Sequence, residues 1–398
     1  MKQKAELRRN LKYIALHGLY WMYWCVCNNY LSVFLLERGY TSSVIGFLIA
    51  AGFIGSLILQ PVIASVADRS RRLTPTLILA ACFGVSMILE LLRLLLPGKS
   101  AILSVVCVLS IALLQTAQPL INAYASYLER LGEPIRFGVA RGVGSLTFSV
   151  LSTLLGYLTA AHGAAFLPGV GAFLLLLLIG LMALMRAEGK IPDVHTETES
   201  VSDLTLRQLA RKYRNVLFLL GGVCALFAAH AYADNFFIQI VEAAGGDSAD
   251  MGVLFAYGAV LEVPFMFGFG WFRRRRSCTW LLKLAAVFFV AKDVCLCLAT
   301  SVPIIYLAMT FEAPSYGLFA AASVCYITEV MAPEDQNRGQ SLVTVMTAAG
   351  AILSSLFGGV LIDSFSVFGA TAVCTAVAAF GMLLIVFGMH EPKKCEAK

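Results

Sequence analysis

The stretch TSSVIGFLIAAGFIGSLILQPVIASVADRSRR, residues 41–72, contains the pattern that recurs along the whole chain. Residues 41–66 carry no charged side chain, and a helix needs roughly 20 apolar residues to cross a bilayer core of about 30 Å. Asp68 and three arginines then end the apolar run. The stretch therefore predicts a membrane-spanning helix that is followed by a basic loop.

The composition of the chain is that of a membrane protein. Of its 398 residues, 59% are hydrophobic and 14% are charged, against roughly 45–50% and about 25% in soluble domains. These values exclude a soluble globular enzyme, and the aromatic content excludes a disordered chain. The formal charge of +6 would favour nucleic acid only on a soluble basic surface. Because the basic residues fall between apolar runs, we expect a lipid bilayer as partner and no nucleic acid.

Apolar runs of spanning length predict the fold class, an all-α membrane protein with twelve transmembrane helices. A polar connection at 187–214 separates an N-terminal six-helix bundle, 1–186, from a C-terminal one, 215–398. An offset of 204 residues superimposes the two halves, as expected of a transporter built from a parallel repeat. The predicted spans are about 11–36, 41–66, 74–97, 101–128, 138–162, 165–185, 215–241, 249–272, 278–299, 302–330, 338–362 and 366–389.

The distribution of positive charge predicts the orientation in the membrane. Of the 30 Lys and Arg residues, 24 fall in segments that share one side when the N-terminus is cytoplasmic. Since cytoplasmic loops are enriched in Lys and Arg, both termini are expected in the cytoplasm and the protein in the cell inner (plasma) membrane. We expect it to be monomeric.

Motifs for other chemistry are absent from the sequence. Gly98-Lys99-Ser100 ends like a phosphate loop, but Arg93 occupies the position of the required earlier glycine. The 11 cysteines show no metal-ligand or disulfide spacing. We therefore predict no enzymatic activity, no metal and no cofactor, with the proton gradient as the energy source.

Several stretches resemble the major facilitator superfamily, and within it the branch of lactose permease and the oligosaccharide, nucleoside and phenylpropionate proton symporters. These stretches are Phe34-Leu35-Leu36-Glu37-Arg38-Gly39 with Ile45-Gly46, Phe137-Gly138-Val139-Ala140-Arg141-Gly142-Val143-Gly144-Ser145, Ser315-Tyr316-Gly317-Leu318-Phe319, and Arg338-Gly339-Gln340-Ser341-Leu342. The resemblance covers essentially the whole chain and implies a two-bundle transporter that works by alternating access.

The superfamily's loop motif between the second and third helices is present here in altered form. Both of its glycines are replaced, while Asp68, Arg69 and Arg72 remain available for the clasp between helices that the resemblance implies. In the fourth span, Asn122 stands where lactose permease has a sugar-binding carboxylate, which argues against a galactoside.

The candidate substrate-binding residues lie mostly in the N-terminal half. A guanidinium cannot discharge itself and offers five donors, so Arg141 suits hydroxyls or a carboxylate, the alternative being an arginine satisfied by helix-end carbonyls. The resemblance implies an aromatic platform at Phe148. Tyr20, Trp24 and Asn28 share one helical face that suits stacking on a sugar or aromatic ring, the alternative being bundle packing. The remaining candidates are Gln115, Asn122 and Glu262.

Charged residues inside the C-terminal spans are the candidates for proton coupling, because each charge at a helix centre costs about 2.5–3.5 kcal/mol to insert. The resemblance places the proton site in helices 9 and 10, which favours Glu312 with Lys292 as its modulating charge and Asp293 beside it. The alternative is a static salt bridge. His230 and Asp234, four residues apart, form a further gating or structural pair.

These residues predict proton-coupled uptake of a small polar or aromatic solute, with a sugar favoured over a nucleoside or aromatic acid. The alternative is proton-antiport efflux of drugs or metabolites. Efflux antiporters usually carry a Gly-Pro motif in helix 5, whereas 142–157 contains no proline. A membrane sensor that does not transport is a third alternative.

Overall fold

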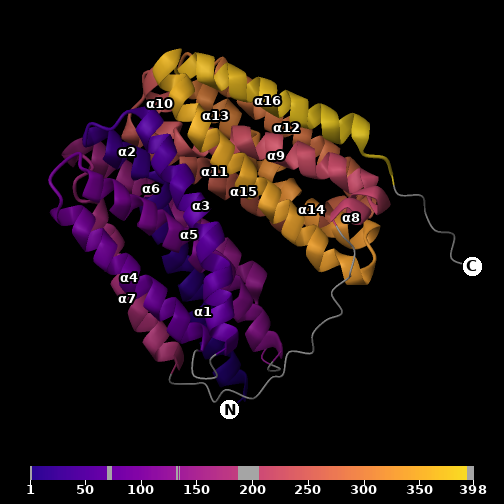
Figure 1. The fold of residues 1–398 in the computed structure, drawn as a ribbon, viewed down its shortest axis with the longest axis horizontal. Coiled ribbons are helices and arrows are strands. Elements are labelled where there is room, and N and C mark those ends of the chain that lie inside the picture. Colours follow the sequence, from indigo (N-terminus) through magenta and orange to yellow (C-terminus); the bar gives the residue numbers. More distant parts are fainter. Residues whose placement is uncertain (1, 70–73, 131–132, 134, 187–205, 392–398) are drawn as a thin grey trace, which may run out of the picture.

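The computed structural model describes residues 2–69, 74–130, 133, 135–186 and 206–391 (Figure 1). This part of the chain is almost entirely helical and contains no strand. The first half consists of α1 (Lys2–Trp24), a π-helical turn (Cys25–Asn29), α2 (Leu31–Glu37), α3 (Ser42–Arg69), α4 (Pro75–Leu95), α5 (Ala101–Arg130), α6 (Phe137–His162) and α7 (Leu167–Arg186). The second half consists of α8 (Leu206–Lys212), α9 (Arg214–Asn235), α10 (Phe237–Ala243), α11 (Ser248–Arg275), α12 (Cys278–Cys297), α13 (Val302–Thr310), a second π-helical turn (Ala313–Gly317), α14 (Leu318–Val330), α15 (Pro333–Ser364) and α16 (Val367–Gly388).

Ten of the predicted spans coincide with helical stretches that are long and apolar enough to cross a membrane. The other two predicted spans, the first and the ninth, do not meet this criterion of length and hydropathy, and each has a structural reason. The first is divided among α1, its π turn and α2. The ninth, α12, contains three charged side chains, Lys283, Lys292 and Asp293. The fold class predicted from the sequence, a twelve-helix membrane protein, is confirmed.

Helix ends are set by local sequence signals. Thr74 caps α4 and accepts from the Leu77 amide, with proline at the next position. Asp247 forms a capping box with Asp250 at the start of α11. Gly163, at φ +77°, ends α6 in a backbone conformation that favours glycine. These signals place the turns close to the sequence breaks and so fix the lengths of the spans.

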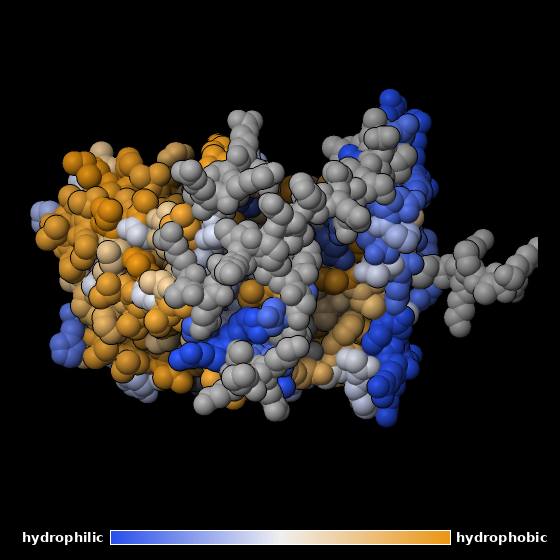
Figure 2. Space-filling view, turned by 90° about the horizontal axis from the view of Figure 1, so that it is seen from below, coloured by the Kyte–Doolittle hydropathy of each residue, from blue (hydrophilic) through white to orange (hydrophobic). Residues whose placement is uncertain are grey.

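The helices form two groups that converge at one end (Figure 1). Helices α1 to α7, indigo to magenta, lie at the lower left, and α9 to α16, rose to yellow, extend from the top, where α10 lies near α2, to the right. Seen from below, hydrophobic side chains cover the left part of the surface and hydrophilic ones gather at the right edge (Figure 2). Exposed apolar residues such as Ile58, Val150 and Phe387 belong to the surface that suits lipid.

The two groups touch tightly at the end that carries α2 and α10. The Ser43 amide and hydroxyl, at the start of α3, donate to Asp363 Oδ2 of α15 over 2.7 and 2.5 Å. Ser32 also donates to the Asn235 carbonyl. A Cβ on Gly46 would lie 2.0 Å from the Ser355 carbonyl oxygen, so only glycine allows this approach of α3 and α15. This end of the interface between the groups is closed.

Candidate functional site

A cavity of about 280 Å³ lies between the two groups of helices. Three of its walls come from α1, α5 and α6, and the fourth comes from the second π turn and α14. Each wall contributes residues spaced four apart, so one face of each helix is turned to the cavity. The lining residues are His17, Tyr20, Trp21, Gln118, Ile121, Asn122, Phe137, Arg141, Tyr316, Ala320 and Ala321.

Trp21 and Arg141 form the centre of the wall that the first half contributes. The Arg141 guanidinium carbon lies 4.0 Å from the centre of the Trp21 ring, a cation–π contact between α1 and α6. Arg141 Nη1 also donates to Ser145 Oγ over 2.9 Å. A Cβ on Gly144 would lie 2.6 Å from Trp21 Cδ1, so the glycine makes room for the indole. The pair presents an aromatic face and unused guanidinium donors to the cavity.

A charged network lies behind the fourth wall. Lys292 Nζ, on α12, donates to Glu312 Oε2 over 2.8 Å and lies 3.0 Å from His230 Nδ1 on α9. His230 Nδ1 lies 3.6 Å from Glu312 Oε1, and its Nε2 lies 3.6 Å from Asp234 Oδ2. The side chains of Lys292 and Glu312 are almost fully buried, whereas Asp234 is 41% exposed. The network thus runs from a buried ion pair to a carboxylate that solvent can reach.

The π turn at Ala313–Gly317 connects this network with the cavity. Pro314 lies in the turn and lacks an amide hydrogen, and such bulges are frequent at functional sites. Glu312 immediately precedes the turn. Tyr316 lies within it, stacks on His230 with ring centres 5.4 Å apart, and lines the cavity. Tyr316 is therefore in contact with both the His230 network and the cavity.

Comparison with known proteins gives the family. A model described as the MFS_1 like family matches residues 13–371. The chain belongs to this family. It is a transporter of the major facilitator type and not an enzyme, as the sequence predicts. It is also a multi-pass membrane protein.

The relatives of this MFS_1 like chain, and the solved structures that resemble it, are transporters. A protein of Deinococcus radiodurans named as a sugar efflux transporter is 24% identical over 92% of this chain and 94% of its own. The maltose permease of Geobacillus stearothermophilus is 27% identical over 89% of each chain. A mutant of the nucleoside transporter NupG has the same fold, with a TM-score of 0.82 at 13% identity over 96% of this chain and all of its own. An auto-inhibited peptide transporter superimposes at 0.73 and 11% identity over 98% and 99%.

The residues that the sequence predicts for the substrate site of this MFS_1 like transporter divide into two groups. Tyr20, Asn122 and Arg141 line the cavity. The other five lie outside its lining. Trp24 packs against Tyr20 and Trp21, and Phe148 packs edge-on against Phe255. Asn28 is buried in the first π turn, Gln115 is buried on α5, and Glu262 is half-buried on α11.

The structure brings together four of the five residues predicted for coupling or pairing in the second half. Lys292, Glu312, His230 and Asp234 form the network. Asp293 forms no hydrogen bond or ion pair with these four side chains among the described residues: the residue is 3% exposed, and its Oδ2 has no hydrogen-bond partner there. For the predicted clasp, Arg72 and the side chains of Asp68 and Arg69 lie outside the described residues, so this clasp stays a prediction.

Sequence reasoning missed five lining side chains that carry polar or aromatic groups. His17 and Trp21 lie one turn apart on α1, and Gln118 lies one turn before Asn122. Phe137 lies one turn before Arg141, and Tyr316 lies in the second π turn. The four-residue spacing to an already chosen residue was the available signal for Gln118 and Phe137. Proline at 314, just after a buried glutamate, was the signal for the π turn.

Proposed function

We propose that this transporter carries out proton-coupled uptake of a small sugar or oligosaccharide. The observation that carries the proposal is the contact of Tyr316 with both the cavity and the His230, Lys292, Glu312 and Asp234 network. Substrate in the cavity and protons in the network would then act on one shared side chain. Both relatives have sugar-related names, and one of the two names specifies efflux.

The charge balance of the buried groups supports proton coupling. The spans around the network hold four carboxyls, those of Asp234, Glu262, Asp293 and Glu312, and fewer permanently basic side chains, Lys292 and Arg141. An uncompensated buried charge is expensive, so the site favours protons on some of the carboxyls. A rearrangement that exposes the site to the other side of the membrane would change which carboxyl holds a proton.

The cavity wall supports a sugar as substrate. Tyr20 and Trp21 line the cavity with aromatic surface of the kind that packs on a sugar ring. Arg141, Asn122 and Gln118 add hydrogen-bonding groups to the same lining. A cavity of about 280 Å³ matches a small polar solute rather than a large one. The absence of proline in 142–157 of α6 favours uptake over antiport efflux, in line with the resemblance.

We further propose that the basic end of the molecule, with both termini, faces the cytoplasm of the inner membrane and that the transporter acts as a monomer. With this orientation the closed end near α2 and α10 faces outward. The proposed orientation is supported by the asymmetric Lys and Arg count.

The test is transport by purified protein in proteoliposomes, with Glu312→Gln and Arg141→Ala as the variants. We expect Arg141→Ala to lose sugar binding. Glu312→Gln should bind and exchange sugar across the membrane, yet lose accumulation driven by an inward proton gradient. Unchanged accumulation in Glu312→Gln would show that the network does not couple to protons.

The direction and substrate class need separate arms of the same experiment. Accumulation driven by an inward proton gradient supports symport, whereas loss of loaded sugar under that gradient supports the efflux alternative. Thermal-shift measurements with maltose, a nucleoside and an aromatic acid separate the substrate classes, because a ligand stabilises only the folded state to which it binds. Stabilisation by the nucleoside or acid alone would contradict a sugar.

A further inference from the structure

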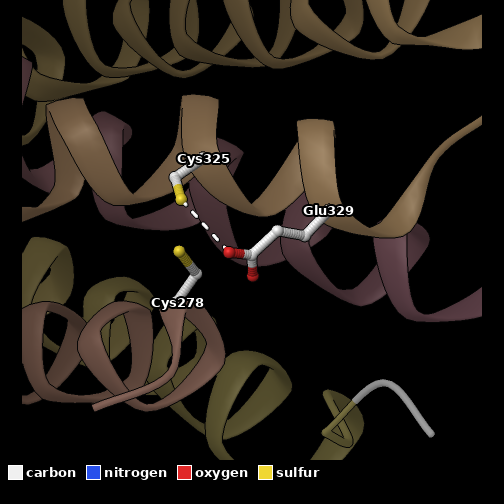
Figure 3. A group of neighbouring side chains, drawn as sticks. All are labelled: Cys278, Cys325 and Glu329. Carbon is white, nitrogen blue, oxygen red and sulfur yellow. Dashed lines mark hydrogen bonds between the residues drawn. The ribbon is translucent and has the colours of Figure 1, made fainter. Parts of the chain in front are cut away.

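Two cysteines and a glutamate meet at the junction of α12 and α14, away from the cavity lining (Figure 3). Cys278 is the first residue of α12, and Cys325 and Glu329 lie one turn apart on α14. Their sulfur and carboxylate oxygen atoms all lie within 4.8 Å of one another. Figure 3 shows the Cys278 and Cys325 sulfur atoms facing each other, with the Glu329 carboxylate beside them.

The spacing is close to that of a metal site. A tetrahedral zinc ion holds sulfur at about 2.3 Å and carboxylate oxygen at about 2.0–2.2 Å, which places ligand atoms about 3.5–3.8 Å apart. Cys325 Sγ already lies 3.4 Å from Glu329 Oε1. Residues four apart on a helix face are a recurrent chelating pair. Cys278 therefore needs a shift of about 1 Å at most to complete three ligands.

The surroundings suit the charge of such a site. The Arg273 guanidinium binds Glu329, with Nε 3.0 Å from Oε1, and holds the carboxylate beside the thiols. A divalent cation together with Arg273 balances two thiolates and one carboxylate. Cys278 is buried at the start of α12, whereas Cys325 and Glu329 are partly exposed on α14.

We propose that Cys278, Cys325 and Glu329 bind one thiophilic divalent cation of the Zn²⁺ or Cd²⁺ class, with water as the fourth ligand. Thiolates select soft cations over Mg²⁺ and Ca²⁺. Binding releases two protons, one from each thiol, as two sulfur–metal bonds form. The ion ties the first turn of α12 to the end of α14, the helix that continues from the π turn of Tyr316.

This site is independent of the proposed sugar transport, and its test measures the metal alone. The full-length protein, kept reduced with a phosphine, is titrated with Cd²⁺, and thiolate–Cd²⁺ bonds are followed by their ultraviolet absorption. We expect one Cd²⁺ per chain. Cys325→Ser should weaken binding at least tenfold, because it removes one of two soft ligands, and Glu329→Gln should weaken it less.

The matched control is Cys224→Ser, at a half-buried cysteine of α9 that lies outside the cluster. It should bind Cd²⁺ as the unsubstituted protein does. Zn²⁺ should raise the melting temperature of the unsubstituted protein and of Cys224→Ser, but not that of Cys325→Ser. Equal Cd²⁺ binding by Cys325→Ser and the unsubstituted protein would overturn the site. A Cys278–Cys325 disulfide that persists under the reductant would overturn it as well.

Discussion

Each half of the transporter buries one pair of opposite charges, and the two pairs are built differently. In the first half, Arg93 Nη1 donates to both oxygens of Glu90, at 2.9 and 3.0 Å, on the single helix α4. In the second half, Lys292 of α12 pairs with Glu312, which precedes the π turn before α14. Both pairs are nearly free of solvent, with each side chain at most 6% exposed.

The difference lies in which partners can separate. Glu90 and Arg93 lie three residues apart on one rigid helix, so a movement between helices leaves their contact unchanged. Tyr23 also donates to Glu90, and Phe34 packs on Arg93. Glu312 and Lys292 come from different helices, and His230 contacts both. A movement between helices can therefore change the partners of the second pair only. We infer that a buried charge is a coupling candidate when its partner lies on another element.

The largest expected effect is the loss of stability in Glu90→Gln. This variant leaves the buried Arg93 without a counter-charge, and breaking a buried pair in this way costs about 3–5 kcal/mol. Chemical unfolding in detergent measures the loss. Glu312→Gln is the matched comparison and should lose less than half as much, because Asp234 remains beside His230 in the same network.

A double variant separates charge from packing. Glu90→Gln with Arg93→Met removes both charges and should recover most of the lost stability, because a neutral buried pair has no uncompensated charge. If the double variant is as unstable as Glu90→Gln, the pair does not act through its charges. Equal destabilisation by Glu90→Gln and Glu312→Gln would contradict the proposed difference between a pair within one helix and a pair that joins two elements.

Asp293→Asn tests whether a second buried carboxyl of the second half takes part in coupling. The buried Oδ2 atom of Asp293 has no donor among the described residues, so the neutral carboxyl is favoured there. Asparagine keeps this neutral form but cannot release a proton. We expect unchanged stability and sugar exchange, with gradient-driven accumulation reduced about tenfold, equivalent to about 1.4 kcal/mol. Full accumulation would remove Asp293 from coupling, and a large loss of stability would reveal a charged partner.

Gly144→Ala examines the aromatic wall that the first half contributes. The added methyl group must displace Trp21, which lies 2.6 Å from the new Cβ, and so weakens its contact with Arg141. Because a cation–π contact contributes about 0.5–2 kcal/mol, we expect KM for the sugar to rise about fivefold with little change in kcat. Gly138→Ala, on the same helix with nothing within 4 Å, is the control. A KM rise of equal size in both variants would contradict the role of Trp21.

The sequence predicted the fold because long apolar runs and basic loops are strong, local signals. Residues 41–72 alone contain a full span and its boundary, and the structure places α3 at Ser42–Arg69. The sequence also singled out Lys292 and Glu312, because charges inside transmembrane spans are rare and conspicuous; the structure brings the two together, and their role in coupling stays a prediction. Trp21, by contrast, faces the cavity through the rotation of α1 against α6, which periodicity does not determine. With 46 residues between them, Cys278 and Cys325 are too far apart in sequence for a motif to predict that they meet.

The smallest effect is expected at a third ion pair, Lys212 with Asp335. Its nitrogen–oxygen distance equals that of Arg93 and Glu90, but its lysine is much more exposed. Lys212 Nζ lies 2.9 Å from Asp335 Oδ2, as Arg93 does from Glu90, yet the lysine side chain is 44% exposed. Asp335 itself is buried, but it also accepts from the Tyr213 hydroxyl over 2.7 Å, so its carboxylate keeps a donor when the lysine is removed. Lys212→Gln should therefore leave the melting temperature within the scatter of repeat measurements. A loss as large as that of Glu90→Gln would show that contact distance, and not burial, decides the contribution of an ion pair here.

The contribution of the Lys212–Asp335 pair to stability depends on pH in a direction that the pKa shift of Lys212 determines. Hydrogen bonds to Asp335 and Tyr213 raise the pKa of Lys212 above its usual value. A cation whose pKa is raised by folding contributes its stabilisation at every pH below about 10.4, the value in the unfolded chain, and loses it only as the pH rises through the folded value. Any difference between Lys212→Gln and the unsubstituted protein should thus stay constant from about pH 5 to 9. Thermal unfolding across this range measures it, and a difference that changes with pH would assign the titration to another group.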